Sequence, residues 1–229
     1  YKGPLIVMMN RMSASASEIF AGAIKDYNRG VIVGSRSFGK GTVQELLELD
    51  QARLKLTRAK FYRVSGESTQ HLGILPDINF PQIYNTEDTG ESSLEGALPW
   101  DTTIKALFKS YPGIDQMIEK IKTAYMSRSK TDPGIRYLTR RIQLMNDLSS
   151  DKPLSLNIEH RKQQKEEGQK KELELENEYR KAVGKSILNE MEDNDNTHTM
   201  KDLKEIVMAQ AHLLWLILLR WPTGTRLHG

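Results

Sequence analysis

The chain has 229 residues, of which 38% are hydrophobic and 28% charged, and this composition suffices for one or two globular domains. The formal net charge at pH 7 is only +3 and the basic residues are spread along the chain, so nucleic-acid binding is not indicated. The absence of cysteine excludes disulfides, thiolate metal sites and a cysteine nucleophile.

The first predicted element is a buried strand at residues 5–9, which form a continuous apolar run. The chain starts at Tyr1, without an initiator methionine, and reaches this run almost at once. We therefore expect the chain to begin inside a domain, and in that case the lack of a visible signal peptide leaves export open.

A helix is predicted to follow this strand. Ser15 and Glu18 have the Ser-x-x-Glu spacing of a capping box. A second apolar run at residues 31–34 predicts the next strand. Strand, helix and strand at this spacing are typical of a right-handed crossover unit in a layered α/β domain. Between the two strands, apolar side chains recur on one helical face at Ile19, Phe20, Ala23, Ile24 and Tyr27.

A β-hairpin is predicted after the crossover unit, because apolar and charged residues alternate on both sides of Asp50 and Gln51. Residues 59–64 are expected to extend the hairpin. Residues 72–77 are rich in turn formers, and residues 84–93 are predicted to be a polar loop or linker.

The pattern becomes helical in the remainder of the chain. Helical spacing of apolar residues is present at 104–111, 118–125 and 138–145. Residues 159–183 are dominated by Lys, Glu and Gln, which is typical of a solvated helix. The apolar run at 213–219 is shorter than the ~18 residues that a membrane-spanning helix needs. We interpret it as a helix end packed on the protein, with an exposed, aggregation-prone tail as the alternative.

The expected fold class is therefore α/β, a layered core with a strand–helix–strand crossover and a β-hairpin, followed by a mainly α-helical C-terminal domain. The change of pattern places the predicted domains at residues 1–93 and 94–229.

Reactive side chains converge at the crossover unit. Ser15 stands between a buried strand and a helix start, close to N–H groups at the positive end of the helix dipole, which suits a nucleophile whose attack generates an oxyanion. The loop that carries Lys40 follows the neighbouring strand and can reach the same edge of the sheet. Because burial disfavours a charged lysine, a neutral lysine there can accept the proton of a serine hydroxyl.

Other interpretations of these residues stay open at this point. Ser15 also fits a helix N-cap with no catalytic role. Gly34, Gly39 and Lys40 have the spacing of a phosphate-binding loop, but Gly41 stands where that loop needs Ser or Thr. The five histidines show no metal-ligand spacing, so neither a metal nor a cofactor is predicted.

Two motifs resemble the signature of the C-terminal processing peptidase family. They are Ser-Ala-Ser-Ala-Ser-Glu-Ile at residues 13–19 and Gly-Lys-Gly-Thr-Val-Gln at residues 39–44, in the order and at the separation found in that family. Residues 72–77 resemble the family's segment after the hairpin. The family is one of serine proteases with a layered α/β core, so the resemblance implies that fold and that activity.

The resemblance also implies a role for individual residues. Ser15 corresponds to the nucleophile and Lys40 to the general base. Gln44 corresponds to the residue that positions the lysine, and the backbone N–H of Ala16 to one donor of the oxyanion hole. The family's mechanism involves no cofactor.

The later part of the chain is similar, more loosely, to the C-terminal helical domain of the tail-specific protease branch. The similarity lies in residues 97–101 and 127–138. Members of that branch are exported enzymes of the Gram-negative periplasm that cleave proteins recognised through apolar C-terminal residues. The resemblance implies such protein or peptide substrates, adaptor proteins as further partners, no nucleic acid and a periplasmic location. Inner-membrane association is left open, although no transmembrane helix is predicted.

Two departures from the family's pattern favour an alternative. The family's PDZ domain and the upstream strand that completes its oxyanion hole are not in this chain, and residues from about 213 onward do not resemble the family's ending. The alternative is a catalytically incompetent fragment that serves only as a helical protein-binding module. A purely structural helical adaptor would explain residues 94–229 but leave the motifs around Ser15 and Lys40 unexplained.

Overall fold

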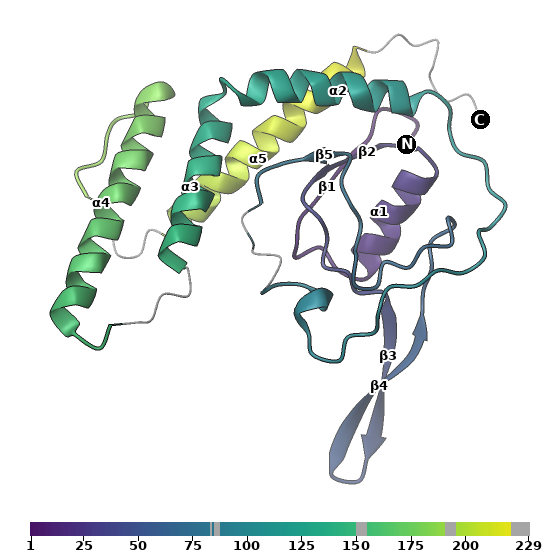
Figure 1. The fold of residues 1–229 in the computed structure, drawn as a ribbon. Helices are drawn as coiled ribbons and strands as arrows, with labels where there is room; N and C mark the ends of the chain where they lie inside the picture. Colours follow the sequence, from purple (N-terminus) through teal and green to yellow (C-terminus); the bar gives the residue numbers. More distant parts are fainter. Residues whose placement is uncertain (83, 85–87, 150–154, 191–195, 221–229) are drawn as a thin grey trace. The chain divides into compact units, whose positions relative to one another are not determined.

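The structure is a computed structural model that describes residues 1–82, 84, 88–149, 155–190 and 196–220 (Figure 1). The chain forms two compact units, one made of Tyr1–Thr123 with the segment from Ala211 onward, and the other of Ala124–Gln210. This division by contacts does not test the predicted domains at residues 1–93 and 94–229, which stay a prediction.

The first unit contains a three-stranded parallel sheet in the order β1–β2–β5 (Figure 1). Strand β1 (Ile6–Met9) pairs with β2 (Val31–Gly34), and β5 (Ile78–Asn79) pairs with the other side of β2. Helix α1 (Ala16–Asp26) connects the first two strands, so the predicted crossover is confirmed. The valine and isoleucine side chains of β2 are fully buried because this strand lies at the centre of the sheet.

Helix α1 is fixed on the sheet by an apolar core and by two ion pairs near its C-terminal end. Lys25 Nζ lies 2.6 Å from Asp77 Oδ1, and Asp26 pairs with Arg63. Asp77 also accepts a 2.8 Å hydrogen bond from the N–H of Ile32 in the central strand. The apolar core comprises Met9, Ala21, Ile32 and Ile74, with Val7 and Ile24 packed against it.

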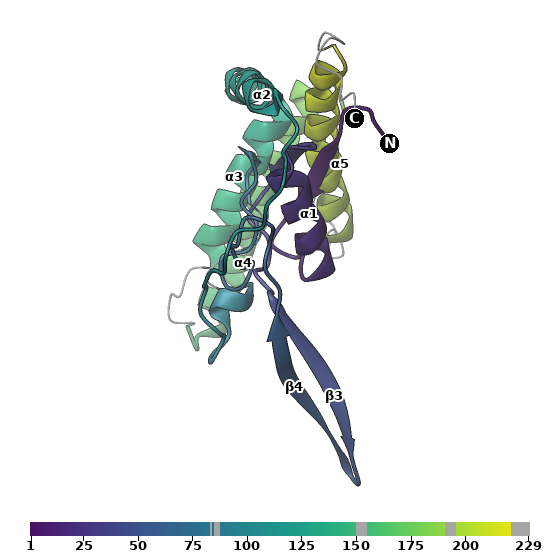
Figure 2. The same cartoon turned by 90° about the vertical axis from the view of Figure 1, so that its right-hand side faces the viewer.

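The predicted hairpin is confirmed. Strands β3 (Thr42–Leu49) and β4 (Ala52–Lys60) are antiparallel, with a bulge between Val43 and Gln44. The hairpin projects away from α1 in both views (Figures 1 and 2). Its expected extension through residue 64 is wrong, because β4 ends at Lys60.

Residues 104–111 are not helical, so the helix predicted there is wrong. The N–H of Ala106 donates to the carbonyl of Val64 at 3.0 Å, and the N–H of Tyr111 donates to the carbonyl of Tyr27 at 2.8 Å. The Phe108 ring packs edge-on against the Tyr27 ring, with centroids 5.4 Å apart. These contacts with other segments take the place of helical hydrogen bonds, so tertiary structure overrides the apolar spacing.

The other predicted helices are confirmed, and with them the fold class of an α/β core followed by a mainly helical part. They are α2 (Ile114–Ser129), α3 (Pro133–Ser149) and α4 (Ile158–Ala182), followed by α5 (Asn196–Leu219). In the second unit these helices bury a set of apolar side chains, namely Tyr125, Ile135, Tyr137, Leu138, Leu175, Leu203 and Ile206.

The apolar end of α5 is packed within the first unit, in agreement with the interpretation of residues 213–219 as a packed helix end. Leu214 and Leu218 are buried, and Trp215 Nε1 donates to the carbonyl of Pro4 at 3.3 Å. Among the described residues, no helix combines the length and the apolar character that crossing a membrane requires.

The end of β2 requires a glycine. Gly34 has φ of 118°, and an added Cβ would lie 2.0 Å from the carbonyl oxygen of Met9 in the neighbouring strand. Gly34→Ala is expected to lower the free energy of unfolding, measured by urea denaturation, by at least about 3 kcal/mol through strain and clash together. Gly96→Ala is the control, because its φ is also positive, at 75°, but nothing lies within 4 Å. It should cost about 1 kcal/mol, and equal losses in the two variants would contradict the argument from the clash.

Candidate functional site

Ser15 lies at a sharp turn between β1 and α1. Its φ of 58° and ψ of −117° are uncommon for a residue with a side chain, and strain of this kind is typical of functional sites. The side chain is half-buried. Ala16 is the first residue of α1, so its N–H is among those that cannot bond within the helix. The Ser15 hydroxyl and the N–H of Ala16 therefore belong to neighbouring residues in the turn that leads from β1 into α1.

Lys40 lies in the loop that joins β2 to the hairpin, and it is half-buried. Its Nζ donates to Gln44 Oε1 at 2.8 Å. The Gln44 amide in turn donates to Thr57 Oγ1 on the opposite strand at 3.4 Å. The predicted role of Gln44 is to position Lys40, and this role requires a hydrogen bond between the two side chains, which is present. Gln44 lies near the start of β3, so the hairpin holds the lysine amine in place.

The Glu18 carboxylate joins the serine turn to the lysine loop. It is fully buried and accepts four hydrogen bonds. Its Oε2 accepts from the backbone N–H groups of Ser15 at 2.9 Å and Lys40 at 2.8 Å, and its Oε1 accepts from Gly39 N–H at 2.7 Å and Ser37 Oγ at 2.5 Å. The backbone nitrogens of Ser15 and Lys40 thus lie within two hydrogen-bond lengths of each other.

All four partners of Glu18 are donors. Ser37 Oγ already accepts a hydrogen bond from Ile74 N–H at 2.6 Å, so the serine gives its proton to Glu18. The pKa of the Glu18 carboxyl is raised above its ordinary value because burial disfavours the charge, and the hydrogen bonds from Ser37 and three backbone N–H groups oppose this shift. Four donors match the acceptor-only ionised form. The sequence indicated only a capping box at this residue and missed its contacts with the lysine loop.

Arg11 holds the lysine loop from the other side. Its fully buried guanidinium donates to the carbonyls of Ser37 and Thr89, both at 2.5 Å, and to Ser92 Oγ at 2.9 Å. Burial lowers its pKa, followed by the nearby charge of Arg36. The sequence predicts a polar loop or linker at residues 84–93. The described residues 88–93 form a loop with a short 3-10 turn that packs against the site, so the linker alternative does not apply to them.

A buried glutamine connects the same segment to the residue after Lys40. Gln70 Oε1 accepts from Gly41 N–H at 2.8 Å, and its Nε2 donates to Glu91 Oε1 at 3.0 Å and to the carbonyl of Leu98 at 3.1 Å. Glu91 also donates its N–H to the carbonyl of Phe38 at 3.0 Å. No sequence motif marks Gln70 or Glu91, because only the fold brings them together.

The arrangement suits nucleophilic attack on a carbonyl. It offers a hydroxyl on a strained turn, an amine oriented by an amide, and a helix N–H for an oxyanion. Among the residues that the structure describes, no group of three or more His, Asp or Glu side chains could hold a metal ion. The individual roles of Ser15, Lys40, Gln44 and Ala16 stay predictions.

Comparison with known families divides the chain into two matched ranges. The family model described as Peptidase family S41 matches residues 1–80, and the model described as C-terminal domain of tail specific protease (DUF3340) matches residues 84–212. The chain belongs to the tail-specific protease family. The resemblance of residues 13–19 and 39–44 to this family is thereby confirmed, and both motifs lie in the peptidase range.

Individual relatives agree with this assignment. The tail-specific protease of Haemophilus influenzae is 39% identical over 219 residues, which are 90% of this chain and 32% of that protein. The carboxy-terminal-processing protease of Bartonella bacilliformis is 48% identical over 100 residues, 41% of this chain and 23% of that protein. A solved structure of the photosystem II D1 C-terminal processing protease is 42% identical over 34% of this chain and 20% of that chain, with a TM-score of 0.32 that supports no structural argument. The chain thus spans about a third of the length of the tail-specific protease it matches.

The pairing of Gln70 with Glu91 can be tested by exchanging the two residues. Gln70→Glu would set two buried carboxylates against each other, so the free energy of unfolding is expected to fall by about 3 kcal/mol or more. Adding Glu91→Gln restores a donor opposite the new carboxylate and should recover more than half of the loss. Urea unfolding of the three proteins at pH 7 measures both effects.

Gln163→Glu is the matched control. Gln163 Nε2 donates to Glu167 Oε1 at 3.1 Å, so it forms the same kind of pair, but on the surface of α4. Its substitution should change the free energy of unfolding by less than about 0.5 kcal/mol. A double variant no more stable than Gln70→Glu alone would show that the two side chains do not act as a pair.

Proposed function

We propose that the protein is a serine endopeptidase that uses Ser15 and Lys40 as a dyad. Ser15 Oγ attacks the scissile carbonyl, and Lys40 in its neutral form accepts the hydroxyl proton. The lysine then passes this proton to the leaving amine, and water activated by Lys40 hydrolyses the acyl-enzyme. The observation that carries the proposal is the single Glu18 oxygen that binds the backbone N–H of both residues.

Two further residues have supporting roles in this proposal. The N–H of Ala16 donates to the oxyanion of the tetrahedral intermediate, and loss of one such donor typically costs about a hundredfold or more in rate. Gln44 orients the Lys40 amine through the 2.8 Å hydrogen bond at Nζ. Its carbonyl oxygen accepts a hydrogen bond from one N–H of the amine, which leaves the lone pair of the neutral amine available to point elsewhere.

The proposed substrates are proteins or peptides with apolar C-terminal residues, with adaptor proteins as further partners. The proposed location is the periplasm of a Gram-negative bacterium. Membership of the tail-specific protease family and the 39% identity to the Haemophilus influenzae protein support both proposals. An apolar C-terminus should be cleaved faster than the same peptide ending in a charged residue.

Substitution of Ser15 and Lys40 in the full-length protein tests the dyad. The substrate is a peptide that ends in apolar residues. Ser15→Ala and Lys40→Ala should each lower kcat by at least about a thousandfold, because nucleophile and base act as one unit. Gln44→Ala should lower kcat without abolishing turnover, since it removes only the orientation of the amine. Steady-state hydrolysis measures all three.

Ser17→Ala is the control for the nucleophile. Ser17 is exposed and its Oγ only donates to the carbonyl of Ala14, at 2.8 Å, so activity should be nearly retained. Wild-type turnover by Ser15→Ala or Lys40→Ala would reject the dyad. The 229-residue chain, assayed alone, tests the alternative of an incompetent fragment, which robust hydrolysis would refute.

A further inference from the structure

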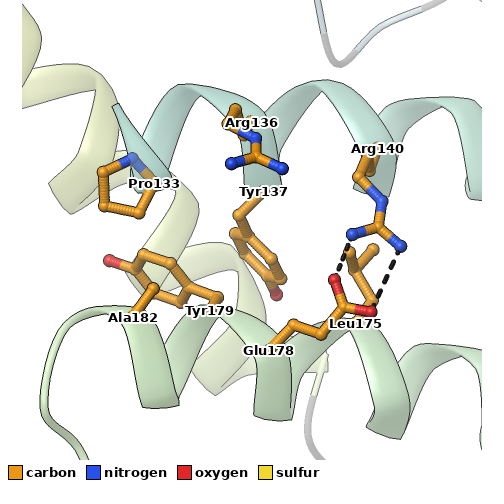
Figure 3. Close-up of a pocket in the computed structure, with 8 residues that line it drawn as sticks. All are labelled: Pro133, Arg136, Tyr137, Arg140, Leu175, Glu178, Tyr179 and Ala182. Carbon is orange, nitrogen blue, oxygen red and sulfur yellow. Dashed lines mark hydrogen bonds and ion pairs between the residues drawn. The ribbon is translucent and has the colours of Figure 1, made fainter. Parts of the chain in front are cut away.

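A small pocket lies in the seam between α3 and α4, within the second unit (Figure 3). It is far along the chain from the proposed dyad, and both helices contribute side chains at the spacing i, i+3, i+4, i+7, which defines one helical face. The lining residues are Pro133, Arg136, Tyr137 and Arg140 of α3, and Leu175, Glu178, Tyr179 and Ala182 of α4.

The size of the pocket indicates what it can hold. Its volume is about 90 Å³, whereas sites for small molecules and cofactors usually measure about 300–1,000 Å³. A whole metabolite therefore does not fit, but one aliphatic side chain does. This favours a peptide that inserts a single residue.

The aromatic wall of the pocket is held in place by its surroundings. The Tyr137 and Tyr179 rings are stacked, with centroids 4.6 Å apart and planes inclined by 18°. The Tyr137 hydroxyl donates to Glu176 Oε2 at 2.6 Å, and both residues are buried. Leu175 beside them is also buried, so an apolar side chain would meet a wall that is already formed.

The rim of the pocket is positively charged. Arg140 is committed to Glu178 by two hydrogen bonds, which Figure 3 marks with dashed lines. The hydrogen bond from Arg140, and the nearby charges of Arg140, Arg136 and Lys181, lower the pKa of Glu178. The exposed Arg136 side chain makes no hydrogen bond or ion pair within the described residues. Two arginines and one carboxylate thus line the pocket, and Arg136 can bind a further carboxylate.

We propose that this seam binds an acidic peptide segment of a partner protein, in which an apolar side chain stands next to an Asp or Glu. The apolar side chain fills the space between Tyr179, Leu175 and Ala182, and the carboxylate accepts two hydrogen bonds from the Arg136 guanidinium. Arginine is suited to this second contact because its planar fork matches a carboxylate. The aliphatic anchor supplies affinity and the ion pair supplies selectivity, since an exposed ion pair alone contributes little.

The test uses the 229-residue chain labelled with nitrogen-15 and a short end-blocked peptide with Leu next to Glu. Blocked ends remove the terminal carboxylate, so only the side-chain carboxylate is available. Amide signals of residues 133–140 and 175–182 should shift on titration. Arg136→Gln should weaken binding about two- to fivefold, the range of an exposed ion pair, and Ala182→Leu, which fills the pocket without changing charge, should weaken it further.

Arg161→Gln provides the matched control for Arg136→Gln, because it makes the same change of charge in the same unit, on α4 but outside the pocket. It should bind like the wild-type chain. Replacing Glu by Gln in the peptide should weaken binding to the wild-type chain and not to Arg136→Gln. Equal binding by Arg136→Gln, Ala182→Leu and Arg161→Gln would overturn the proposal, as would signal shifts confined to residues outside the seam.

Discussion

The site depends on one buried carboxylate. Moving a carboxylate out of water costs several kcal/mol, and Glu18 is tolerated in the interior only because four donors surround it. Three of these donors are backbone N–H groups from two separate segments, so neither segment can move without leaving the charge unsatisfied. The same hydrogen bonds stabilise the strained backbone of Ser15, which a free turn would not adopt. One glutamate thus sets the distance between the serine turn and the lysine loop.

A second layer of contacts closes the lysine loop from outside. Arg11, Gln70 and Glu91 connect the loop to residues 89–98, which lie in the range matched by the C-terminal domain of tail-specific protease. The peptidase range supplies the reactive side chains, and the beginning of the next matched range holds their loop. The two ranges are therefore coupled at the site itself, whatever the arrangement of the helices that follow.

Sequence patterns predicted the parts of this structure that local interactions determine. The crossover from β1 to β2, the hairpin and the helices α2 and α3 follow from the pattern of apolar residues, and α4 follows from its Lys, Glu and Gln content. The motifs located Ser15 and Lys40. The patterns failed where contacts between segments far apart in the chain determine the local conformation or the hydrogen-bond partners. Residues 104–111 have helical spacing but form hydrogen bonds to Val64 and Tyr27. The partners of Glu18 in the lysine loop, and those of Gln70, lie about 20 or more residues away in the chain. Such contacts have no local signature, because only the folded sheet brings the segments together.

Amide hydrogen exchange tests the role of Glu18 most directly. The N–H groups of Ser15, Gly39 and Lys40 lie outside helices and strands, yet they should exchange slowly because a buried carboxylate binds them. In Glu18→Gln, whose amide group must face some of these donors, all three should exchange at least about tenfold faster. The N–H of Gly41, which binds Gln70 instead, should keep its rate. Fast exchange of the three groups in the wild-type chain, or unchanged rates in Glu18→Gln, would contradict the account.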